Sequence, residues 1–120
     1  MHSNREGIPI VFQSASSYSR YVEWGEMDGG FWGFSAGFDS IPLFKGLPNG
    51  CECPHWGYLL KGRMRVRYAD HEEVITAGEA YYLAPGHLPV MEEDCEMVEF
   101  SPKDESRRML QYASRSMASR

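Results

Sequence analysis

The sequence lacks any hydrophobic run long enough to cross a membrane or to act as a secretory signal. Residues 1–17 hold one short apolar run, Ile8-Pro9-Ile10-Val11-Phe12, which follows Arg5 and Glu6. Cysteine is also scarce: there are three, an odd number that argues against a framework of disulfides. We therefore expect a cytoplasmic protein with reduced thiols that does not contact a membrane.

Basic residues are outnumbered by acidic ones. Twelve Lys and Arg face seventeen Asp and Glu, which gives a formal net charge of -5. A negative surface repels phosphate backbones, so nucleic acid is excluded as a partner. Hydrophobic residues make up 42% of the chain and charged residues 24%, close to globular averages, which excludes disorder. The 120 residues are enough for one domain with a real core.

Helical periodicity is missing from most of the chain, and short strands between turns take its place. We predict a hairpin from Tyr18–Trp24 and Phe31–Phe34, with its turn at Asp28-Gly29-Gly30. The run Arg63–Tyr68 alternates with period two, so Met64, Val66 and Tyr68 should face the core and the arginines water. Further strands are predicted at 58–60, 73–76, 80–83 and 96–100. Roughly eight short strands at near-regular spacing predict an all-β barrel or jelly roll.

The end of the chain has a different pattern. Ser101-Pro102-Lys103-Asp104 has the order of a helix start, with Ser101 as the N-cap and Pro102 in the first turn. An apolar stripe at helical spacing follows: Met109, Leu110, Ala113 and Met117. We therefore divide the chain into a flexible N-terminal segment at 1–17, a β-barrel at 18–100 and a C-terminal α-helix at 101–120, packed on the barrel or on a second subunit.

Two segments resemble the paired motifs of the cupin superfamily: residues 53–66 (CPHWGYLLKGRMRV) and residues 78–87 (GEAYYLAPGH). The resemblance covers about half of the chain and implies a small single-domain cupin of the conserved-barrel type, with a jelly-roll β-barrel fold. It also implies a metal ion inside the barrel, held by two histidines and a glutamate of the first motif and one histidine of the second. Cupins are often dimeric, and we predict a homodimer.

The standard ligands of that family are absent. The glutamate position falls on His55, and the two histidine positions fall on Asn49 with Cys51, or on Pro48 with Gly50. The last histidine position falls on Pro89. The resemblance therefore predicts the fold but leaves the ligand set to be argued from the residues that are present.

Those residues offer a different site. Cys53 and His55 alternate across Pro54 and can both face the barrel interior, where His87 can meet them. Cys51 would be a fourth ligand only if the chain bends near Pro54, because in a straight strand it lies roughly 13 Å from His55. Thiolate and imidazole favour zinc, with nickel, copper or iron behind it. Four protein ligands would indicate a structural site, and three would leave a position open.

A small organic ligand is expected in the same cavity, with Trp56 and Tyr82 as walls and Lys45 to orient an anionic group. The acidic run Glu92, Glu93, Asp94, Glu96 and Glu99 is interpreted as a solvated edge. Two functions stay open. One is a metal-dependent enzyme of unassigned reaction. The other is a non-catalytic binding or sensing module whose cupin site has degenerated into a pocket.

Overall fold

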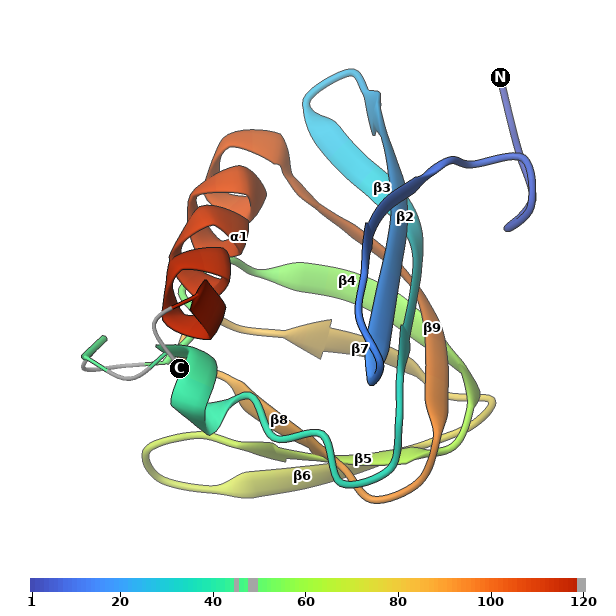
Figure 1. Cartoon of the computed structure of the whole chain (residues 1–120). Helices are drawn as coiled ribbons and strands as arrows, with labels where there is room; N and C mark the ends of the chain where they lie inside the picture. The colour runs from blue at the N-terminus through green and yellow to red at the C-terminus, as the bar shows by residue number, and fades with distance from the viewer. Residues whose placement is uncertain (45, 48–49, 119–120) are drawn as a thin grey trace.

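Two antiparallel sheets and one C-terminal helix make up the computed structural model of the protein, which describes residues 1–44, 46–47 and 50–118. The first sheet has the order β1-β2-β3-β9-β4-β7 and the second the order β6-β5-β8 (Figure 1). The strands are β1 Ile10–Gln13, β2 Ser17–Trp24, β3 Met27–Phe34, β4 His55–Lys61, β5 Arg63–Arg67, β6 Glu72–Thr76, β7 Ala80–Leu83, β8 Leu88–Met91 and β9 Cys95–Pro102. The order confirms the predicted all-β jelly-roll architecture.

The β2–β3 hairpin turns earlier than the sequence analysis predicted. Trp24 pairs with Met27, which leaves Gly25 and Glu26 as the turn, and Gly25 takes a positive φ of 65°. A two-residue turn with glycine first matches the right-handed twist of the strands. Asp28-Gly29-Gly30 therefore lies inside β3. This part of the prediction was wrong because these glycines serve packing inside the strand and not a turn. Gly29 and Gly30 allow neighbouring parts of the same chain to approach closely: a Cβ on Gly30 would lie 1.8 Å from the Arg20 carbonyl oxygen in β2.

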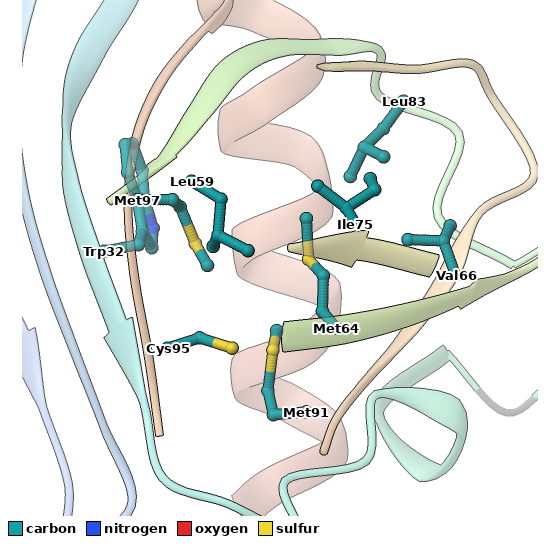
Figure 2. Close-up of a cluster of buried hydrophobic side chains, with 9 residues drawn as sticks. All are labelled: Trp32, Leu59, Met64, Val66, Ile75, Leu83, Met91, Cys95 and Met97. Atoms are coloured by element: carbon teal, nitrogen blue, oxygen red, sulfur yellow. The ribbon is translucent and has the colours of Figure 1, made fainter. Parts of the chain in front are cut away.

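The barrel core lies between the sheets, and the alternation of β5 predicted it well. Met64 is 1% exposed and Val66 is fully buried, while the arginines on either side face water. Figure 2 shows Met64 and Val66 among the buried side chains that both sheets contribute. These side chains are Trp32, Leu59, Met64, Val66, Ile75, Leu83, Met91, Cys95 and Met97. Tyr68, the third predicted core residue, is half-buried and packs against this cluster.

Part of the N-terminal segment forms a strand. Ile10–Gln13 forms strand β1 along the edge of the first sheet, where it pairs with β2, and Ile8 is 2% exposed. The buried Ile8 and the ladder to β2 tie this part of the segment to the first sheet. The alternation signal was missing because β1 is an edge strand whose four residues are all exposed.

Helix α1, Lys103–Ala118, lies beside the short 3-10 turn η1, Ile41–Phe44, at left in Figure 1. The helix is confirmed up to Ala118, and residues 119–120 lie outside the described residues. It packs on the barrel of its own chain, through Met109 among others. Its predicted N-cap was wrong, because β9 continues to Pro102 and the Ser101 side chain is buried against His55. Among the described residues, no helix has the length and apolarity that a bilayer crossing requires.

Candidate functional site

Backbone pairing brings Cys51 and His87 together although they are far apart in the sequence. Cys51 donates its N–H to the His87 carbonyl at 3.2 Å, and Gly86 donates to the Cys51 carbonyl at 2.7 Å. Gly50 precedes this bridge with a positive φ of 69°, a conformation that glycine adopts without strain. Both side chains are buried: Cys51 is 4% exposed and His87 is 2% exposed.

The chain then bends, and the bend brings in His55. Residues 52–54 form no strand, and the extended run of β4 begins only at His55. As a result the Cys51 Sγ lies 4.0 Å from the His55 Nε2, and the His55 and His87 ring centroids are 4.9 Å apart. One ligand atom from each of Cys51, His55 and His87 lies within 4.8 Å of the others. The bend near Pro54 that was required for Cys51 to take part is therefore present.

Cys53 is not in this cluster, contrary to the prediction that made it the first ligand. Its Sγ lies 3.4 Å from the Pro54 carbonyl, and the residue packs with Cys51 and Met109 under helix α1. The prediction assumed a straight strand, in which residues 53 and 55 point the same way. The bend removes that relation, so Cys51 rather than Cys53 shares the interior with His55.

The second nitrogen of each histidine has a partner within the fold. His87 Nδ1 donates to the Ala84 carbonyl at 2.7 Å, which leaves Nε2 with the lone pair that binds a cation. His55 Nδ1 lies 2.5 Å from Ser101 Oγ and 3.9 Å from Glu99 Oε2, while its Nε2 faces Cys51. The Ala84 carbonyl fixes the orientation and the tautomer of His87, and the Ser101 contact fixes the orientation of the His55 ring. Such contacts are typical of histidines that ligate metal ions.

Burial sets the protonation of the three groups. It lowers the pKa of His55 to about 4, and burial with the nearby His55 lowers the pKa of His87 to about 4. Both rings are therefore neutral near pH 7. Burial also raises the pKa of the Cys51 thiol to about 12, so the thiol keeps its proton until a cation replaces it.

Glu99 belongs to the same site, and the sequence analysis missed it. The residue is 8% exposed, and burial raises the pKa of its carboxyl. Tyr81 donates its hydroxyl to Glu99 Oε1 at 2.6 Å. The prediction of a solvated acidic edge was wrong here. The alternation of β9 contains the signal, because Glu99 shares a face with Met97 and Ser101, and both are buried.

A cavity of about 320 Å³ opens beside the cluster. Its walls include Cys51, His55, His87 and Glu99, with Trp32 and Met97 from the barrel. Helix α1 closes it with Ser106, Met109, Leu110, Ala113 and Ser114. The site therefore combines a group of ligand atoms with space for a small molecule.

The predicted wall residues lie elsewhere. Trp56 and Tyr82 are 45% and 50% exposed, and their rings pack on each other, with centroids 5.2 Å apart, on the outer face of β4 and β7. Neither lines the cavity. The physical reason is strand alternation: His55 faces inward, so the next residue, Trp56, faces outward. Lys45 lies outside the described residues.

No protein-family model and no curated protein matches this sequence. Solved structures do match the fold. An RmlC-like cupin from Shewanella frigidimarina NCIMB 400 has a TM-score of 0.60 at 17% identity, over 83% of this chain and 88% of that one. Ectoine synthase from P. lautus has a TM-score of 0.62 at 15% identity, over 85% and 77%. Fe(II)-HppE with the alternative substrate (S)-1-HPP has a TM-score of 0.59 at 8% identity, over 84% and 59%.

These likenesses show that the chain shares the fold of these solved structures, an RmlC-like cupin among them: a jelly-roll β-barrel with a C-terminal helix. At these identities the comparison shows the fold alone, and the chemistry has to come from the site.

The cluster fits a metal ion by its donor set. Two atoms bound to one tetrahedral zinc ion stand about 3.5 Å apart, given Zn–N near 2.1 Å and Zn–S near 2.3 Å. The ligand atoms here lie within 4.8 Å of one another, so closing onto an ion needs movements of about 1 Å. Two neutral imidazoles and one thiol are ligand types that zinc prefers, and all three come from one chain.

Proposed function

We propose that the protein binds a divalent metal ion, preferably zinc, through Cys51, His55 and His87. A small organic ligand binds in the adjoining cavity. The observation that carries this proposal is the convergence of the three ligand atoms to within 4.8 Å at the cavity wall. A soft thiolate beside two imidazoles favours zinc over oxygen-loving ions, with nickel, copper or iron behind it. Among the neighbours by fold, Fe(II)-HppE carries iron.

Three protein ligands leave a coordination position for the ligand or for water. When bound there, such an ion supplies Lewis acidity and lowers the pKa of water. The chain's own residues have distinct tasks around it. Ser101 and Ala84 hold the two rings in place. Glu99, held by Tyr81, offers a carboxylate to accept a hydrogen bond or a proton from a molecule in the cavity.

The predicted cytoplasmic location would suit this site, because reducing conditions keep Cys51 free to bind. All three cysteines are free in the structure. A homodimer stays a prediction, and the site does not need one, since every proposed ligand belongs to the same chain. The reaction, if the ligand is a substrate, stays unassigned: the cupin fold hosts many chemistries.

The test compares two neighbouring cysteines. Protein stripped with a chelator is titrated with zinc, and bound metal is measured by elemental analysis after dialysis. We expect one equivalent in the wild type and a loss of affinity of about 100-fold or more in Cys51→Ser. Cys53→Ser is the matched control, because that sulfur is equally buried but turned toward Pro54, and it should bind zinc within about threefold of wild type. Equal losses in both variants would contradict the proposed ligand set.

A further inference from the structure

The cavity walls carry almost no charge. Among the described residues that line it, none is Lys or Arg, and Glu99 is the one ionisable carboxylate. The polar side chains are mostly hydroxyls, such as Ser19 and Ser40, and Ser40 already donates to the Pro89 carbonyl at 2.7 Å. The rest of the wall is aromatic rings, aliphatic chains and methionine sulfur. Among these described wall residues, a carboxylate, phosphate or phosphonate on a ligand would find no basic side chain to pair with.

We infer that the cavity takes an uncharged, mainly apolar molecule of about a dozen non-hydrogen atoms, whose single polar atom faces the Cys51–His55–His87 cluster. The size follows from a volume of about 320 Å³ at ordinary packing density. The class is that of small alcohols, phenols, thiols or ketones on an aromatic or branched frame. The inference rests on the proposed function for the orientation of the polar atom and on the walls alone for the lack of charge.

The test uses three probes of one shape: 2-naphthylmethanol, 2-naphthoate and 2-naphthylmethylammonium. Calorimetric titration at pH 7 is run on the chelator-stripped protein. We expect the alcohol to bind at least tenfold more tightly than either ion. Ala113→Leu, which fills part of the cavity from helix α1, should weaken the alcohol at least tenfold. Trp56→Ala, on the outer face, should leave its affinity unchanged.

Three results would overturn the inference. The first is a charged probe that binds the wild type as tightly as the alcohol does. Naphthoate binding that is this tight and that Lys45→Ala abolishes is one form of this result. The second is weak binding of all three probes, with Kd above about 1 mM. The third is an affinity that Ala113→Leu leaves unchanged. Failure to bind zinc would instead refute the proposed function, and the ranking of probes on the stripped protein would still decide the class of ligand.

Discussion

Acid should unfold the metal-free protein early, because two histidines are buried in the neutral state. His55 and His87 have their pKa lowered from 6.5 to about 4 by burial. Between these two pH values the unfolded chain binds more protons than the folded one, so stability falls as the pH falls. The contribution is fully present above about pH 6.5 and is lost on the way to pH 4.

The magnitude follows from linkage. Lowering the pH from 7 to 5 costs about 2 kcal/mol for a histidine with these two pKa values, and about 4 kcal/mol for the pair. This is a large part of the free energy of unfolding of a typical domain, which is about 5–15 kcal/mol. Glu99 acts in the opposite direction. Its pKa is raised by burial, so the folded state binds its proton more readily and the net loss is smaller than the sum for the histidines.

The assay is urea unfolding, followed by circular dichroism in chelator, at steps between pH 7 and pH 5. His87→Asn keeps a donor for the Ala84 carbonyl but removes the titrating ring, so its loss of stability over this range should be about 2 kcal/mol smaller than that of wild type. His71→Asn is the control, since that ring is exposed in a turn beside Asp70. If wild type and His87→Asn lose stability with the same pH dependence, the reasoning from buried neutral rings is refuted.

Two further predictions test the fold around the site. Gly62→Ala should cost more stability than Gly37→Ala in thermal unfolding, because both glycines have positive φ but only at Gly62 would the new Cβ lie 2.3 Å from a backbone oxygen, whereas nothing lies within 4 Å at Gly37. Equal losses would mean that the positive φ, and not the contact of the new Cβ, sets the cost in stability. Arg107→Ala should lower Tm more than Arg108→Ala, because Arg107 holds the fully buried Asp28 at 3.0 Å and Arg108 reaches only a surface carboxylate. A larger effect at Arg108 would contradict this assignment.

Patterns that depend on near neighbours could be predicted from the sequence. The alternation of β5 correctly indicated that Met64 and Val66 are core residues, and β7 begins and ends where the sequence placed it, at Ala80 and Leu83. The two motifs also indicated the cupin fold correctly, because glycine and proline at turns are tied to the shape of the barrel. The sequence also contained the information on which side chains of β4 share a face: His55 and Trp56 are adjacent in a strand, so they cannot both face the cavity.

Which residues belong to the site depends on the path of the chain. Cys51 joins His55 only because residues 52–54 bend, and no local pattern states the angle of that bend. His87 arrives through a single backbone bridge to Cys51. Glu99 becomes a buried carboxylate because the fold closes over the inner face of β9 and Tyr81 hydrogen-bonds to it.

By itself, the sequence determined the all-β barrel, its terminal helix and the kinds of ligand atom on offer, because residue type and short-range periodicity are properties of neighbouring positions. The tertiary structure alone decided which sulfur stands beside the two imidazoles and which acid is withdrawn from water. Those facts arise where segments distant in the chain meet, and their geometry is set by sheet closure, not by any one segment.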